Sequence, residues 1–181
     1  GSEAEAGLGK VDNLLNNAGI QHVAPIDEFP IEKWNAIIAI NLSSAFHTMR
    51  AALPSMKQRR WGRIINTASA HGLVGSVNKS AYVAAKHGVV GFTKVTGLEN
   101  AGTGITANAI CPGWVWTLLV EKHITALAVR DGTDQESAAR ELLVEKPTSL
   151  QFVTPVQLVD MAEFLVSVAA APLSGTAHPV G

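Results

Sequence analysis

Apolar residues recur along the chain in short runs that alternate with longer stretches of helical period. Runs at residues 11–16, 63–69 and 105–110 are rich in Val, Leu, Ile or Ala and predict buried strands. Residues 31–60 carry apolar side chains at three- and four-residue steps, and residues 80–99 form a second helical stretch. Strands joined by crossovers of this length pair in parallel, so the pattern predicts an α/β fold with helices on both faces of a parallel sheet.

The alternation changes after the third strand. Residues 114–151 read as two short helices around a polar turn at 130–134, an insertion placed where lids over a binding site usually lie. Thr154, Pro155 and Gln157 then have the spacing of a helix N-terminus, with threonine as the cap. Residues 175–181 predict the start of a final strand, and Pro54 predicts a break or kink near the end of the stretch 31–60.

Composition is that of a single domain of ordinary charge. The chain has 181 residues, a net charge of −1 and 16% charged residues, which gives no electrostatic reason to expect a nucleic-acid partner or a membrane surface. A single cysteine, Cys111, fits a reducing compartment, and no apolar run reaches the roughly 18 residues of a membrane helix. We therefore expect a cytoplasmic protein. The six histidines lack metal-ligand spacing, so we assign no metal site.

Candidate chemistry lies around the start of the helix 80–99. Tyr82 and Lys86 are four residues apart, which places a phenol and an ammonium group on one helix face. A neighbouring cation favours the phenolate and lowers the pKa of a tyrosine, which would make Tyr82 a usable proton acceptor. Ser69, at the end of the second strand, would project toward the same point. Such a Tyr/Lys pair is by itself an ordinary helix-surface contact, so the surrounding residues have to show whether the pair is catalytic.

Those surroundings resemble the short-chain dehydrogenase/reductase family, in which a serine lies thirteen positions before the tyrosine and a lysine four positions after it. The segments 16–19 (Asn-Asn-Ala-Gly) and 112–113 (Pro-Gly), each after a predicted strand, are two further family marks. The resemblance implies a Rossmann-like, doubly wound parallel sheet and a local distortion of the helix around Asn41. The catalytic residues that it implies are Asn41, Ser69, Tyr82 and Lys86.

The resemblance also implies a nicotinamide cofactor, NAD, at the carboxyl ends of the strands. Small residues at that edge allow a flat cofactor to approach the backbone. The implied cofactor-binding residues are Asn17, Ala18, Gly19, Tyr82, Lys86, Pro112, Gly113, Val115 and Thr117. Asn, Ala and Gly at positions 17–19 would also suit a simple turn.

Within the family, the residues near the catalytic set resemble those of members that act on small 3-hydroxy acids such as D-3-hydroxybutyrate. Gln21, His71 and Lys79 are donors that suit a carboxylate, and Trp114 offers an apolar wall. His123 stands where a glutamine is expected, and its charge would vary near neutral pH. His71 and Lys79 would also suit solvated loop positions. The implied substrate-binding residues are Gln21, Ser69, His71, Lys79, Tyr82, Trp114 and His123.

The resemblance covers nearly all of the chain, yet a family member opens with a Gly-rich strand–helix–strand unit that has no counterpart here. We therefore expect residues 1–181 to form one domain, equivalent to the C-terminal two-thirds of a dehydrogenase whose N-terminal βαβαβ portion is missing. The chain would then be an enzyme with an incomplete sequence, or a truncated, cofactor-incompetent fragment that acts as a binding or structural module. A short-chain dehydrogenase for another small alcohol or ketone is a third reading.

A homo-oligomer is expected from the helix 80–99. Small residues at helical spacing permit close helix contact, and in the family the corresponding helix packs against its copy in another subunit. The resemblance thus implies a tetramer. The small residues concerned are Ala81, Ala84, Ala85, Gly88 and Gly91.

Overall fold

A parallel sheet forms the centre of the structure, a computed structural model that describes residue 7 and residues 9–144 and 151–181. Within these residues the strands follow the spatial order β1-β2-β3-β4, and every neighbouring pair is parallel. The predicted strands are confirmed, with ends that differ by one or two residues. Their bounds are Asn13–Asn16 for β1, Gly62–Thr67 for β2, Ile105–Pro112 for β3 and Ala177–Val180 for β4.

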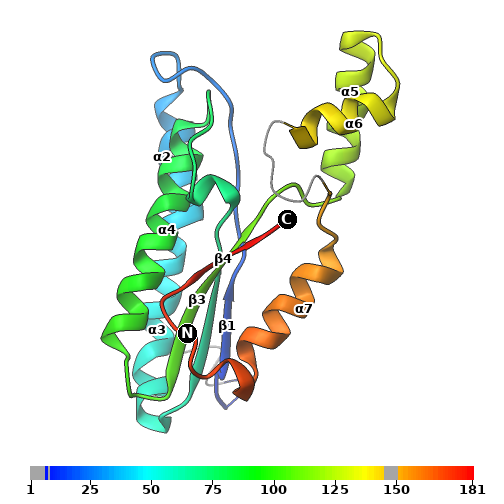
Figure 1. Ribbon diagram of the computed structural model, residues 1–181. Helices are drawn as coiled ribbons and strands as arrows, with labels where there is room; N and C mark the ends of the chain where they lie inside the picture. The colour runs from blue at the N-terminus through cyan, green and yellow to red at the C-terminus, as the bar shows by residue number, and fades with distance from the viewer. Residues whose placement is uncertain (1–6, 8, 145–150) are drawn as a thin grey trace.

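Helices cover both faces of the sheet, which confirms the doubly wound α/β fold (Figure 1). Successive residues of a strand point to opposite faces. Ile64 accordingly packs with Met49 and Met56 of α3 (Ser44–Arg59). Its neighbour Ile65 packs on the opposite side with Leu165 of α7 (Pro155–Val166). The sheet therefore has one hydrophobic core on each side.

The predicted helical stretch 31–60 consists of three parts. α2 (Ile31–Ile38) leads into a π-helical turn, η1 (Ala39–Ser43), and then into α3. The distortion implied around Asn41 is therefore confirmed. The helix does not break at Pro54, because α3 continues through it to Arg59, and the alternative of a kink stays a prediction. Pro54 is exposed, so water can satisfy the carbonyl that loses its N–H partner.

α4 (Ser80–Glu99) has the bounds that the sequence predicts. Three of its small residues pack against other parts of the same chain. Ala81 and Ala85 are buried against Ile37, and a Cβ on Gly88 would lie 2.9 Å from Leu42 Cδ2. These three residues bring α4 close to α2 and η1 inside the chain. Ala84 and Gly91 are exposed, and the subunit contact of α4 stays a prediction.

The two predicted short helices after β3 are confirmed as α5 (Leu118–Asp131) and α6 (Gln135–Val144). They share a small core in which Ile124 and Ala128 meet Ala138 and Leu142. The capping box before α7 is also confirmed, and a 3₁₀ turn, η3 (Val168–Ala170), follows that helix. Among the described residues, no helix combines the length and the apolar character needed to cross a membrane.

Candidate active site

Ser69 lies two residues beyond β2, where the chain turns into the 3₁₀ helix η2 (Ala70–Gly72). Its backbone is extended (φ −173°, ψ 162°), and its Oγ accepts a hydrogen bond from the backbone N–H of His71 at 3.2 Å. This turn brings the His71 ring against Tyr82, edge to face, with ring centroids 5.9 Å apart. Ser69 and His71 are both buried. His71, which would also have suited a solvated loop position, is thus buried beside Tyr82.

Tyr82 and Lys86 occupy successive turns of α4 and face this same point. The Lys86 ammonium donates a hydrogen bond to the carbonyl oxygen of Thr67, the last residue of β2, at 2.6 Å. It lies 5.6 Å from the centroid of the Tyr82 ring. Lys86 is 4% exposed, so a cation is held inside the protein mainly by one backbone carbonyl. The helix and the strand end are thereby tied together beside the phenol.

The electrostatics of the pair differ from the sequence-based expectation. Burial raises the pKa of Tyr82 above its usual value, and a hydrogen bond with the Ser69 side chain opposes this only in part. Lys86 is not among the causes, so its predicted lowering of the tyrosine pKa is not seen in this structure. Burial lowers the pKa of Lys86 itself to about 8. The ammonium is directed to the Thr67 carbonyl, and desolvation therefore dominates both groups.

Lys86 is expected to give the fold a pH-dependent stability. The pKa of Lys86 is about 8 in the folded chain and 10.5 for a lysine exposed to water. Between these values the unfolded chain binds more protons, so this contribution to stability rises with pH above about 8. We expect the free energy of unfolding to increase by about 1 kcal/mol from about pH 7 to pH 9, and Lys86→Met to lose this increase.

Urea denaturation of both proteins at the two pH values measures the effect. Cys111, whose pKa burial raises, opposes the trend only above its usual value of 9.0 and so hardly disturbs this window. Equal slopes in the wild-type chain and in the variant would rule out Lys86 as the source.

The loop after β1 lies beside Lys86. Asn41, buried in the π-helical turn, accepts a hydrogen bond from the backbone N–H of Ile20 at 2.8 Å and donates one to its carbonyl at 2.9 Å. The loop is therefore fixed to the helix. A Cβ on Gly19 would lie 3.8 Å from both Asn41 Oδ1 and Lys86 Nζ. The glycine leaves open the space that these two polar groups face, so the predicted cofactor segment 17–19 is exposed at the edge where Lys86 ends.

The remaining predicted cofactor residues lie after β3, at the same edge of the sheet. Gly113 donates its backbone N–H to the carbonyl of Val180 in β4 at 2.9 Å. Val115 pairs with Val153 in an isolated parallel bridge. Thr117 caps α5, with its hydroxyl 3.4 Å from the backbone N–H of Val120. The Thr117 hydroxyl already accepts this capping hydrogen bond. The roles of all three residues toward a cofactor stay predictions.

One cavity of about 850 Å³ is lined by the residues that are predicted to bind the substrate. It opens between the start of α4, the loop after β1 and the helices α5 and α6. Pro112 and Gly113 also line it. All seven predicted substrate-binding residues are in its wall, namely Gln21, Ser69, His71, Lys79, Tyr82, Trp114 and His123. Residues separated by up to a hundred positions in the chain therefore meet around one space, while their individual roles stay predictions.

The far wall of this cavity contains two charged residues that sequence reasoning missed, Arg130 and Glu141. Trp114 stacks on His123 there, with centroids 6.2 Å apart and an interplanar angle of 18°. The Lys79 ammonium lies 5.8 Å from the Trp114 ring centroid. The position of Arg130 could have been inferred from the sequence, because residues 123, 127 and 130 share one helical face and His123 was already a predicted site residue. The described helices α5 and α6 of the predicted lid insertion 114–151 thus form a wall here. Residues 145–150 lie outside the described residues, and motion of the insertion stays a prediction.

Over the described ranges, no set of three or more His, Cys, Asp or Glu side chains is placed to hold a metal ion.

A parallel α/β sheet that carries serine, tyrosine and lysine at its carboxyl edge defines a class of oxidoreductases that use nicotinamide cofactors. The sequence model described as "short chain dehydrogenase" matches residues 2–127. The chain belongs to this short-chain dehydrogenase family.

Relatives and solved structures agree with that assignment. A D-beta-hydroxybutyrate dehydrogenase of Cupriavidus necator is 64% identical over 172 residues, which are 95% of this chain and 67% of that protein. An actinorhodin polyketide ketoreductase with NADPH has 35% identity and a TM-score of 0.88, over 99% of this chain and 69% of the other. An NAD⁺-bound xylitol dehydrogenase has 27% identity and a TM-score of 0.87, over 99% and 71%. The chain thus spans about two thirds of the length of these proteins.

Proposed function

We propose that the chain forms the catalytic part of an NAD-dependent dehydrogenase that interconverts D-3-hydroxybutyrate and acetoacetate, or a closely similar pair of small 3-hydroxy and 3-keto acids. The observation that carries this proposal is the single cavity in which the donors for a carboxylate and the apolar Trp114 meet Ser69 and Tyr82. The 64% identity to a relative named D-beta-hydroxybutyrate dehydrogenase supports the same substrate class.

The chemistry assigns one step to each polar group. Tyr82 accepts the proton of the substrate hydroxyl in its phenolate form, although burial raises its pKa in this structure, and the buried Ser69 hydroxyl donates a hydrogen bond to the oxygen that becomes the carbonyl. The nicotinamide supplies a hydride acceptor when it is bound. Lys79, in the wall of the same cavity, holds the substrate carboxylate at the other end. In the reverse reaction Tyr82 returns the proton.

The residues at the strand ends fit a cofactor. The open space at Gly19 is faced by the Lys86 ammonium, a hydrogen-bond donor, and by Asn41 Oδ1, an acceptor, and such a pair suits a ribose with its hydroxyl groups. Residues 17–19 would lie along this ribose. The solved relatives hold NAD⁺ in one case and NADPH in another, so the choice of NAD rests on the resemblance to hydroxybutyrate dehydrogenases.

The deciding experiment follows the absorbance of NADH after NAD and D-3-hydroxybutyrate are added to the protein. Stereospecific reduction of NAD is expected, with little product from the L enantiomer. A titration of NADH by its fluorescence accompanies the assay. Binding of NADH without turnover of any small hydroxy acid would contradict the substrate assignment. Failure to bind NADH would favour the fragment that acts as a binding module.

Replacement of Lys79 by methionine is expected to raise KM for D-3-hydroxybutyrate about tenfold with little change in kcat. Lys79 lines the cavity and is proposed to bind the carboxylate, not the reacting carbon. Its ion pair with the carboxylate would stabilise the bound substrate and the transition state equally, so its loss raises KM and leaves kcat nearly unchanged. The methyl ester of the substrate, which lacks the charge, serves as the control, and its KM should hardly change. A similar increase in KM for acid and ester would contradict the role.

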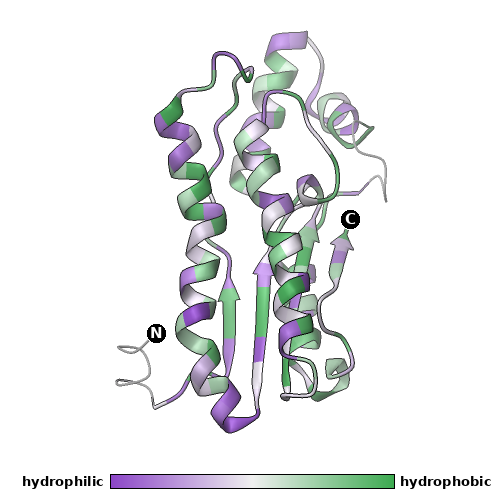
Figure 2. Cartoon of the chain, turned by 90° about the vertical axis from the view of Figure 1, so that its left-hand side faces the viewer, coloured by the Kyte–Doolittle hydropathy of each residue, from purple (hydrophilic) through white to green (hydrophobic). Residues whose placement is uncertain are grey.

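A homo-oligomer, with a tetramer implied by the resemblance, is proposed on the outer face of α3 and α4. Phe46, Val95 and Leu98 are exposed there by 47, 48 and 78%. Figure 2 faces these helices and shows hydrophobic segments along both. Apolar side chains gathered on one face are typical of a subunit contact.

Analytical ultracentrifugation of Gly91→Gln tests this contact. No atom of the chain lies within 4 Å of a Cβ at Gly91, so the substitution should dissociate the oligomer without lowering the melting temperature of the subunit. Gly75→Gln, at an equally open loop position, is the matched control. Sedimentation of the wild-type chain as a monomer would refute the proposal.

A further inference from the structure

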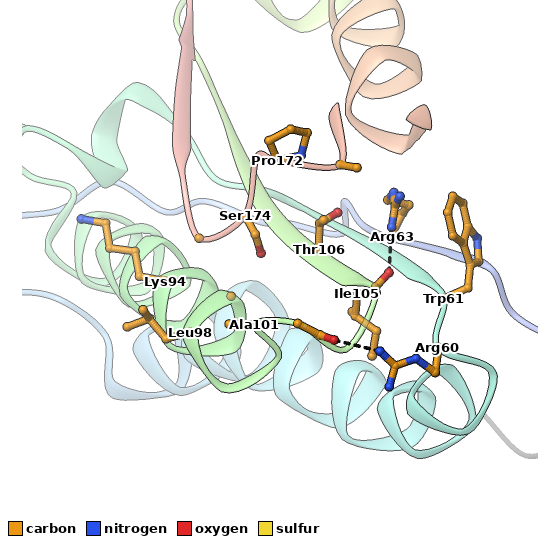
Figure 3. Close-up of a pocket in the computed structure, with 15 residues that line it drawn as sticks. Arg60, Trp61, Arg63, Lys94, Leu98, Ala101, Ile105, Thr106, Pro172 and Ser174 are labelled. Atoms are coloured by element: carbon orange, nitrogen blue, oxygen red, sulfur yellow. Dashed lines mark hydrogen bonds between the residues drawn. The ribbon is translucent and has the colours of Figure 1, made fainter. Parts of the chain in front are cut away.

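A second cavity, of about 880 Å³, lies at the opposite end of the sheet from the active site (Figure 3). It is bounded by the amino ends of β2 and β3, the last turns of α4 and the segment that leads to β4. We call it the basal cavity, and the lining residues that matter here are Arg60, Trp61, Arg63, Lys94, Thr106 and Pro172. From Arg63 to Ser69 the chain rises by about 20 Å at the strand rise per residue, so the two cavities are separate.

The charge of the basal cavity is of one sign. Arg60, Arg63 and Lys94 line it, and no aspartate or glutamate does. None of these three cations is in an ion pair with a described residue. Surface cations are usual, but a cation removed from water is costly unless an anion or several hydrogen bonds compensate. The cavity is therefore suited to an anion.

Arg63 is the buried member of this group, at 2% exposure. One terminal nitrogen donates hydrogen bonds to the carbonyls of Gly62 and Gly104, both at 3.0 Å, and the guanidinium lies 3.9 Å from the centroid of the Trp61 ring. Its Nε has no hydrogen-bond partner. The planar group is thus held in a fixed orientation while part of its donor capacity is unused.

Thr106 supplies a second unused polar group. It is the register partner of Arg63 across β2 and β3, and it is 5% exposed. Its hydroxyl has no hydrogen-bond partner and points toward Arg63 in Figure 3. Buried polar groups in native proteins are nearly always hydrogen-bonded, so these two neighbouring groups could bind an acceptor placed beside them.

We propose that the basal cavity binds a small organic phosphate, a phosphate monoester with an apolar or aromatic group. A monoester carries up to two negative charges and three acceptor oxygens at neutral pH, which matches several cations and a hydroxyl better than a single carboxylate does. Trp61 and Pro172 give the cavity apolar surface for the organic part. The volume lies in the range of small-molecule sites, roughly 300–1,000 Å³. This proposal is independent of the dehydrogenase assignment.

Isothermal titration calorimetry with phenyl phosphate on the chain tests the proposal. Saturable binding is expected, and Arg60→Asn should weaken it at least tenfold. Arg60 has a left-handed backbone (φ 55°) that asparagine tolerates, so this variant removes the charge and keeps the turn. Lys57→Asn removes an exposed cation of α3 outside the cavity and should leave the affinity unchanged. Thr106→Val should weaken binding as well.

The same titration separates the alternatives. Benzoate or inorganic phosphate binding as tightly as phenyl phosphate would overturn the assignment to a phosphate monoester. No saturable binding, or an equal loss in Arg60→Asn and Lys57→Asn, would overturn the site itself. Phenyl phosphate bound in the active site would be displaced by NADH or weakened by Lys79→Met, and either result would contradict the basal cavity as its location.

Discussion

Tyr82→Phe is expected to lower kcat for the oxidation of D-3-hydroxybutyrate by about a thousandfold. The substitution removes one oxygen atom, the proposed proton acceptor, and general base catalysis by a positioned side chain contributes about 10²–10⁴ in rate. The ring itself stays, with its edge-to-face contact to His71 at a centroid distance of 5.9 Å. The loss should therefore appear in kcat, with KM and the melting temperature nearly unchanged.

Steady-state kinetics and NADH titration of the variant measure these quantities together. Ser69→Ala is a useful comparison, because it removes the hydroxyl that is proposed to hold the substrate oxygen and leaves the phenol in place. Normal turnover in Tyr82→Phe would remove Tyr82 from the mechanism. An inactive variant that had also lost its fold would show a lowered melting temperature, which distinguishes the two explanations.

Gly104→Ala is expected to destabilise the fold by about 3 kcal/mol, the largest effect on stability that we predict. Gly104 has φ +85°, a conformation that L residues rarely adopt. A Cβ there would also lie 2.1 Å from the carbonyl oxygen of Arg60, a backbone atom that cannot move without shifting the start of β2. The backbone strain and the steric overlap therefore both lower the free energy of unfolding.

Gly102→Ala is the matched control for this prediction. Gly102 also has a positive φ, +74°, but no atom lies within 4 Å of the position of its Cβ. It should cost only the conformational strain, about 1 kcal/mol. Urea denaturation of both variants gives the two free energies of unfolding. Equal losses would mean that the close approach of Arg60 and Gly104 is relieved by a small backbone movement.

The strands and most helix ends could be predicted because their signals are local. The buried runs, the capping box at Thr154 and the step from strand to helix at Ser80 depend on residues close in sequence. Predictions that depended on contacts with residues distant in sequence were less successful. Ala81 and Gly88 looked like a subunit contact, yet the side chains of Ile37 and Leu42 already cover them.

The candidate site shows the same division. Its members could be chosen from the spacing of Ser69, Tyr82 and Lys86 and from the family resemblance, and the fold does bring the substrate residues together around one cavity. The pKa values could not be inferred in the same way. Lys86 was expected to act on the phenol, but its ammonium binds the Thr67 carbonyl and burial dominates both groups.

The sequence by itself determined the α/β order of elements, the family and the candidates for the reacting groups, because periodicity and motif spacing are encoded along the chain. Only the tertiary structure decided how deeply Tyr82 and Lys86 are buried, that Arg130 and Glu141 reach the substrate cavity, and that Arg63 and Thr106 lie side by side in the basal cavity. Burial and charge neighbours are set by residues far apart in sequence, and these are fixed only when the strands pair and the helices pack.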